Sequence, residues 1–108
     1  MLDTVLLFRY SALTFNAHRI HYDLPYTREQ EGYPALVMNG GLTALLLVET
    51  ARPHLGRAIA GYAARAIRPL FVGERVTFNG RRIADGATLW ASGPDGGLNY
   101  RVDVTLAA

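Results

Sequence analysis

The sequence contains no cysteine and no lysine, and each absence narrows the chemistry that the chain can carry. Without cysteine there can be no disulfide and no thiolate ligand for a metal ion. No apolar run approaches the roughly 20 residues that a bilayer-spanning helix needs. The N-terminus also lacks the charged, apolar and small-residue regions of a signal peptide. We therefore expect a cytoplasmic protein without a membrane partner.

Arginine supplies all eleven positive charges. One explanation is the base composition of a GC-rich gene; the other is that several arginines bind phosphate or carboxylate groups through paired hydrogen bonds. The net charge of +2 is spread along the chain without interleaved aromatic residues, so no nucleic-acid partner is expected. A chain of 108 residues can form one hydrophobic core, which predicts a single domain over residues 1–108.

The apolar pattern predicts one long helix followed by several strands. Residues 41–52 are apolar around nearly the whole helical circumference, which is typical of a buried helix, and Pro53 should end it. Thr27 and Gln30 have the spacing of a capping box. Strands are expected at residues 5–10, 57–68, 75–84, 88–92 and 98–106.

The last expected strand alternates most clearly between apolar and polar residues. Its apolar face would consist of Leu98, Tyr100, Val102, Val104 and Leu106. Its polar face would consist of Asn99, Arg101, Asp103 and Thr105. An apolar helix followed by antiparallel strands predicts an α+β fold in which a sheet wraps around a long central helix, the hotdog arrangement.

Polar residues that can do chemistry are concentrated in residues 11–23. His18 and His21 are two of only three histidines, and an imidazole can move a proton near neutral pH. Asn16 has an amide that can hold a water molecule, although asparagine is also common in turns and caps. We expect His18 to pack or hydrogen-bond within this loop. No third ligand of suitable spacing accompanies the two histidines, so no metal site is predicted.

Residues 7–23, together with residues 68–76, resemble the MaoC-like dehydratase family of hotdog proteins. The resemblance covers nearly the whole chain and is strongest to the branch of itaconyl-CoA and mesaconyl-CoA hydratases. It implies reversible addition of water to a 2-enoyl thioester, with no cofactor beyond the CoA or acyl-carrier part of the substrate. A dicarboxylic acyl-CoA such as mesaconyl-CoA is one candidate substrate.

The resemblance also assigns roles to individual residues. The family motif places an acidic or amide residue five positions before a histidine, which implies that His21 is the general acid and base and that Asn16 positions the water. Backbone N–H groups of Gly40 and Gly41 would stabilise the enolate oxygen, although many relatives have His-Gly-Pro where this chain has Asn39-Gly-Gly. The arginines expected to contact CoA are Arg19, Arg65 and Arg68.

A partner subunit is the last implication of the resemblance. Relatives often contain two hotdog halves in one chain, and this sequence resembles the C-terminal half, which carries the motif. We therefore expect a homodimer or a heterodimer with a second hotdog subunit.

Two alternatives to a hydratase function remain open. One is a non-catalytic acyl-CoA-binding or structural subunit, favoured by Asn39; the other is a thioesterase in which Glu49 would activate water.

Overall fold

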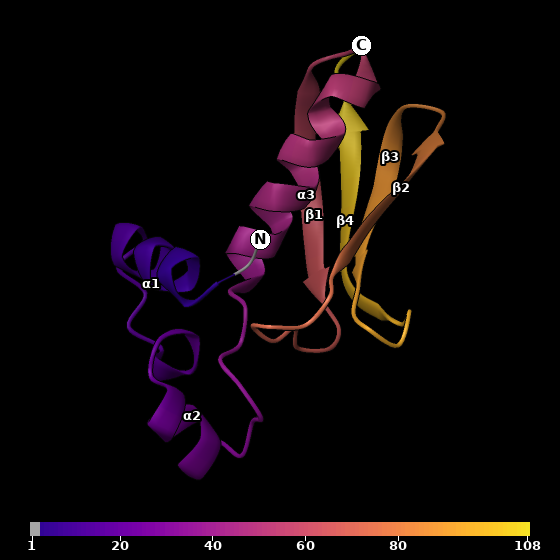
Figure 1. The fold of residues 1–108 in the computed structure, drawn as a ribbon. Coiled ribbons are helices and arrows are strands. Elements are labelled where there is room, and N and C mark those ends of the chain that lie inside the picture. The colour runs from indigo at the N-terminus through magenta and orange to yellow at the C-terminus, as the bar shows by residue number, and fades with distance from the viewer. Residues whose placement is uncertain (1–2) are drawn as a thin grey trace.

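The computed structural model describes residues 3–108 and combines N-terminal helices with a four-stranded antiparallel sheet (Figure 1). In chain order its elements are α1 (Thr4–Leu13), the 3₁₀ turn η1 (Arg19–His21), α2 (Leu24–Glu29), α3 (Gly40–Leu55), β1 (Ile59–Ala66), β2 (Thr77–Ile83), β3 (Gly86–Ser92) and β4 (Leu98–Leu106). The strand order in the sheet is β1-β4-β3-β2. The expected α+β architecture is confirmed.

Helix α3 lies along one face of the sheet, and the core is formed where it packs on β3 and β4 (Figure 1). Leu47 of α3 and Val102 of β4 are among the largest fully buried side chains. The N-terminal end of α3 lies at the end of the sheet where β1 finishes and β4 begins, while α1 and α2 lie beside this end of the helix. This arrangement brings residues distant in sequence to the start of α3. Within residues 3–108, no helix is long and apolar enough to cross a membrane.

The expectation of a strand at residues 5–10 is wrong, because this segment lies within α1. Asp3 caps that helix, with its side chain accepting a hydrogen bond from the backbone N–H of Leu6 at 2.8 Å. A short apolar run does not by itself distinguish a strand from a partly buried helix. The expected capping box is wrong as well. Asp23 caps α2, whereas Thr27 is buried inside that helix and its hydroxyl donates to the carbonyl oxygen of Asp23 at 2.7 Å.

Helix α3 differs from the expectation at its end and on its exposed side. It continues through Pro53 to Leu55, because proline costs one backbone hydrogen bond but its φ angle is compatible with a helix. Gly56 then ends the helix with a left-handed φ of 72°. Leu47 is 2% exposed but Leu45 is 49% exposed, so the helix is buried along one face and not around its whole circumference.

The four strands after the helix are confirmed, with shorter bounds for the first two. In β4 the expected alternation holds from Tyr100 to Leu106 but fails at its start: Leu98 is exposed, and Asn99 is buried. The cause is a register shift, since Ala91 pairs with Tyr100 whereas Ser92 pairs with Leu98. Asn99 is the extra residue of this irregularity.

Candidate active site

His21 is a buried histidine in η1, and one hydrogen bond determines which of its nitrogens is free. Its Nδ1 lies 2.7 Å from the carbonyl oxygen of Val37. A carbonyl oxygen can only accept, so Nδ1 carries the proton and donates it. In the neutral ring, Nε2 is therefore left with a lone pair that can accept a proton from another group.

The environment keeps this imidazole in its neutral form. Burial lowers the pKa of His21, and the positive charge that His18 can carry lowers it further, against the opposing effect of the hydrogen bond to Val37. The two histidine rings meet edge to face, with centroids 5.5 Å apart. The expectation that His18 packs within the loop is confirmed.

A cavity of about 310 Å³ lies at the N-terminal end of α3 and includes His21 in its wall. Gly40 contributes from the first turn of the helix, Arg68 from the segment after β1, and Tyr100 from β4. Three residues expected from the sequence, His21, Gly40 and Arg68, thus line one cavity. The remaining wall is largely apolar, which favours strong electrostatic interactions with a bound ligand.

The first turn of α3 has no side-chain cap. Asp3 and Asp23 cap α1 and α2, but Asn39, at the equivalent position before α3, makes no capping hydrogen bond. The first N–H groups of an α-helix have no partner within the helix, and the helix dipole places partial positive charge there. Because Gly40 lines the cavity, this end of α3 can receive an oxygen that carries negative charge.

Asn39 itself faces α1 and does not line the cavity. Its side chain is 2% exposed, and its Nδ2 donates to the hydroxyl oxygen of Ser11 at 3.3 Å. Its Oδ1 has no hydrogen-bond partner among residues 3–108. Asn39, at the position where the resemblance implies a histidine, therefore connects α3 to α1.

Asn16 and His21 do not line a common cavity in this structure. Asn16 is exposed, and its Oδ1 accepts a hydrogen bond from the backbone N–H of His18 at 3.0 Å, which makes it a turn residue. It lines a separate hollow with Phe8 and Phe15. Phe15 has a positive φ of 53°, unusual for a bulky residue, so the backbone just before Asn16 is strained. The role of Asn16 in positioning water stays a prediction.

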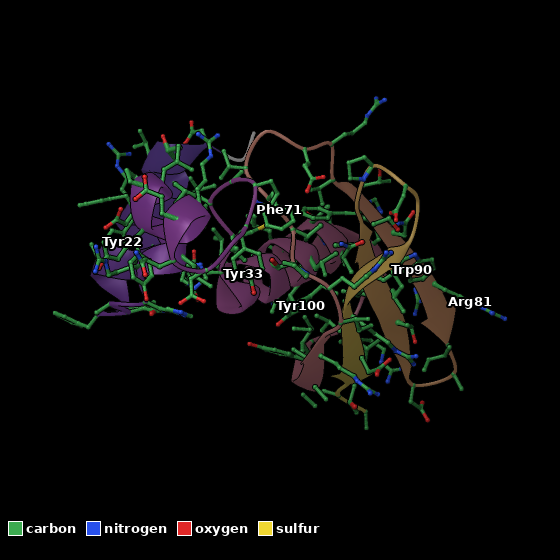
Figure 2. All side chains as sticks on the ribbon, turned by 90° about the horizontal axis from the view of Figure 1, so that it is seen from below. Tyr22, Tyr33, Phe71, Arg81, Trp90 and Tyr100 are labelled. Atoms are coloured by element: carbon green, nitrogen blue, oxygen red, sulfur yellow. The ribbon has the colours of Figure 1, made fainter. Side chains whose placement is uncertain are left out.

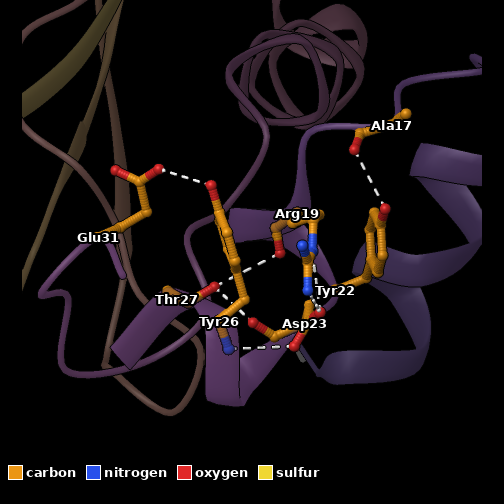
Figure 3. Close-up of polar contacts among 7 residues, drawn as sticks. All are labelled: Ala17, Arg19, Tyr22, Asp23, Tyr26, Thr27 and Glu31. Carbon is orange, nitrogen blue, oxygen red and sulfur yellow. Dashed lines mark hydrogen bonds and ion pairs between the residues drawn. The ribbon is translucent and has the colours of Figure 1, made fainter. Parts of the chain in front are cut away.

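Arg19 is engaged in a local network and does not line the His21 cavity (Figure 3). Its guanidinium forms an ion pair with Asp23 at 2.7 Å and lies over the ring of Tyr26, 4.0 Å from the centroid. The hydrogen bond from Arg19 lowers the pKa of Asp23, with a further contribution from the backbone N–H of Tyr26. These contacts stabilise the junction between η1 and α2.

The other two arginines lie in different environments. Arg65 is exposed and pairs in register with Arg101. Side chains alternate across a sheet, so Arg65 lies on the face opposite its neighbour Ala66, which lines the cavity. Arg68 lines the cavity and is held at its edge by Asp95, with Nη1 3.1 Å from the carboxylate oxygen.

Asn99 and Tyr100 take part in the site but were not anticipated from the sequence. The backbone carbonyl of Asn99 accepts from the N–H groups of Ile67 and Arg68, and its side-chain Nδ2 donates to the carbonyl of Pro69 at 3.1 Å. Asn99 therefore fixes the segment that carries Arg68. Both residues follow a Gly-Gly turn at the start of a strand, but alternation alone assigns one to solvent and the other to the core.

The residues invoked for other chemistry are elsewhere. Glu49, the candidate base of a thioesterase, is exposed and pairs with Arg52 at 2.9 Å, outside the His21 cavity. Among residues 3–108, no group of three histidine or carboxylate side chains is placed to bind a metal ion.

The antiparallel sheet packed on the long helix α3, with His21 and the start of that helix lining one cavity, is typical of a hotdog domain. The model of the hydroxyacyl-thioester dehydratase type 2 family matches residues 1–72, two thirds of the chain. The chain belongs to this family, which confirms the expected resemblance to hotdog dehydratases.

One relative supports this assignment. The chain is 50% identical over 104 residues to mesaconyl-C(4)-CoA hydratase of Chloroflexus aurantiacus, a match that covers 96% of the chain but 37% of that protein. The chain thus spans little more than a third of this curated relative.

Solved structures confirm the hotdog fold. R-hydratase PhaJ1 of Pseudomonas aeruginosa matches with a TM-score of 0.83 at 15% identity, covering 99% of this chain and 74% of that one. The HadBC (3R-hydroxyacyl-ACP dehydratase) complex of Mycobacterium tuberculosis matches with a TM-score of 0.75 at 14% identity, covering 99% and 88%.

Proposed function

We propose that this protein catalyses the reversible hydration of a 2-enoyl thioester, with His21 as the general acid and base. The observation that carries the proposal is the cavity whose wall contains both the oriented imidazole of His21 and Gly40 of the uncapped first turn of α3. A general base must be close to the proton that it takes, and an oxyanion site must supply preorganised donors. The relative named mesaconyl-C(4)-CoA hydratase supports the same chemistry.

In the hydration direction, Nε2 of His21 takes a proton from water while the water oxygen bonds to the β-carbon of the substrate. The electron pair of the double bond moves toward the thioester, and the resulting negative oxygen is stabilised by the backbone N–H groups of Gly40 and Gly41. The protonated imidazole then delivers its proton to the α-carbon. Water has been added, and His21 has returned to its neutral form.

The substrate proposed is an acyl-CoA, including dicarboxylic ones such as mesaconyl-CoA, and the reaction is assigned to the cytoplasm. Arg68 is the arginine best placed to contact the substrate, because it lies at the cavity and is about half exposed. Asn16 would position water only if its side chain leaves the turn that it now stabilises.

A second hotdog subunit is the proposed partner. The HadBC structure is a complex, and a relative of which this chain covers only 37% has room for a second domain. Either a second copy of this chain or a different hotdog chain would satisfy the proposal. Light scattering of the purified protein, alone and mixed with a candidate partner, distinguishes the two arrangements.

The sharpest test of the chemistry is His21→Asn. The asparagine amide can still donate to the carbonyl of Val37 but has no basic nitrogen. Hydration of crotonyl-CoA and mesaconyl-CoA should fall by roughly 10²- to 10⁴-fold, the usual contribution of general acid–base catalysis, while the fold is retained. His18→Asn is the matched control and should keep most of the activity.

Equal rates for the wild-type protein and His21→Asn would refute the catalytic role of His21. Binding of acyl-CoA without turnover, even with a partner, would instead identify a non-catalytic subunit. Release of free CoA thiol would identify a thioesterase, but Glu49 is poorly placed for that reaction because it pairs with Arg52 away from the cavity.

A further inference from the structure

Tyr100 is a buried polar residue at the cavity that the proposed mechanism does not use. It lies on β4 opposite Ala66 of β1 and is 8% exposed. Figure 2 shows it beside α3. The buried side-chain atoms of residues 3–108 that lack a hydrogen-bond partner do not include its hydroxyl oxygen, so this oxygen is open to the cavity that Tyr100 lines. A phenol hydroxyl open to a cavity can donate a hydrogen bond to an acceptor atom of a ligand bound there.

The position of the hydroxyl identifies which ligand atom this would be. A Cβ atom added to Gly40 would lie 3.4 Å from Cε2 and 3.7 Å from Oη of Tyr100. The phenol is therefore packed directly against the first residue of α3. A substrate oxygen that accepts a hydrogen bond from the N–H groups of this turn would also lie within reach of the phenol hydroxyl.

We propose that Tyr100 is a further catalytic residue that donates a hydrogen bond to the thioester carbonyl oxygen, beside the backbone N–H groups at the start of α3. The inference rests on the proposed thioester chemistry of this cavity. The hydroxyl keeps its proton throughout the reaction and stabilises the negative charge that develops on the oxygen.

The surroundings favour a donor. Burial raises the pKa of Tyr100, and the nearby phenols of Tyr62 and Tyr10 raise it further, so the hydroxyl stays protonated at neutral pH. Glycine at position 40 leaves the space beside the phenol open, since a Cβ atom there would already be in van der Waals contact with the ring, 3.4 Å from Cε2.

The test compares Tyr100→Phe with Tyr62→Phe. Tyr62 belongs to the same face of the sheet but is 56% exposed and does not line the cavity, which makes it the matched control. For hydration of crotonyl-CoA by Tyr100→Phe, we expect kcat to fall by on the order of 10²-fold with a much smaller change in KM. Tyr62→Phe should resemble the wild-type protein. A change in KM alone, or none, would overturn the inference.

A second readout separates this inference from the proposed function. Butyryl-CoA labelled with ¹³C at its carbonyl cannot be hydrated, and a hydrogen bond to that carbonyl lowers its infrared stretching frequency. We expect the frequency to be lowered by the wild-type protein and by Tyr62→Phe, and less by Tyr100→Phe. If the wild-type protein hydrates no enoyl thioester but the frequencies follow this pattern, the proposed function fails and Tyr100 keeps its role as donor. Identical frequencies for all three proteins, or no binding of butyryl-CoA, would overturn the role of Tyr100.

Discussion

The substitution Gly41→Ala should destabilise the protein because of a single hydroxyl group. A Cβ atom on Gly41 would overlap the hydroxyl oxygen of Tyr10, while the next atom of that ring, Cζ, would be 3.4 Å away. Tyr10 is partly buried and packs against the core, so its ring cannot move freely.

The expected magnitude is the difference between two opposing effects. Forcing an extra carbon into a packed site costs about 1–3 kcal/mol. Replacing glycine by alanine in a helix gains up to about 1 kcal/mol, and less in the first turn. We therefore expect Gly41→Ala to lower the free energy of unfolding by about 1–2 kcal/mol. In a Tyr10→Phe background the obstructing oxygen is gone, and the same substitution should be neutral or slightly stabilising.

Urea denaturation of the wild-type protein, the two single variants and the double variant measures this coupling directly. Gly40→Ala is the control, because its Cβ would meet the ring of Tyr100 at a tolerable 3.4 Å. If Gly41→Ala costs the same free energy with and without the Tyr10 hydroxyl, steric conflict at the start of α3 is not the reason for glycine at position 41.

Two further predictions concern charge. Because burial lowers the pKa of His21, the unfolded chain binds more protons than the folded one below about pH 6.5, and the free energy of unfolding should fall as the pH decreases toward the folded-state pKa. This component should be absent from His21→Asn; a difference between the two proteins that is constant from about pH 8 to about pH 5 would contradict it. Arg68→Ala should raise KM for CoA substrates, because Arg68 lines the cavity. Arg19→Ala should leave KM unchanged and have little effect on the free energy of unfolding, because its ion pair is exposed. Equal increases in KM would refute this distinction.

The sequence was sufficient for the parts of the fold that depend on local pattern. The long apolar helix, the later strands and the alternation within β4 from Tyr100 onward follow from residue periodicity. The helical state of residues 5–10 does not, because a short apolar run fits either structure, and the hydrogen bond from Leu6 to the Asp3 side chain decides between them.

The candidate site could be predicted only in part, because it depends on contacts between distant residues. The motif identified His21, but its buried position and its bond to Val37 arise from tertiary packing. The residue type alone does not show whether Arg65 or Arg68 lines the cavity. The position of each arginine relative to the sheet decides this. Asn99 was assigned to solvent because the register shift before it leaves no sign in the alternation pattern.

Asn39 stands where the resemblance implies a histidine, but it is less damaging to the proposed chemistry than the sequence suggests. An asparagine before a helix normally caps it, a contribution of about 0.5–2 kcal/mol to stability, and would then occupy an N–H group of the first turn. Here the amide donates instead to Ser11, so it is held toward α1 and the first turn of α3 stays uncapped. Helix α3 tolerates this loss because its buried face, with residues such as Leu47, packs against the sheet. The helix that contributes most to the core is thus the one whose N-terminal donors remain available to a ligand at the cavity.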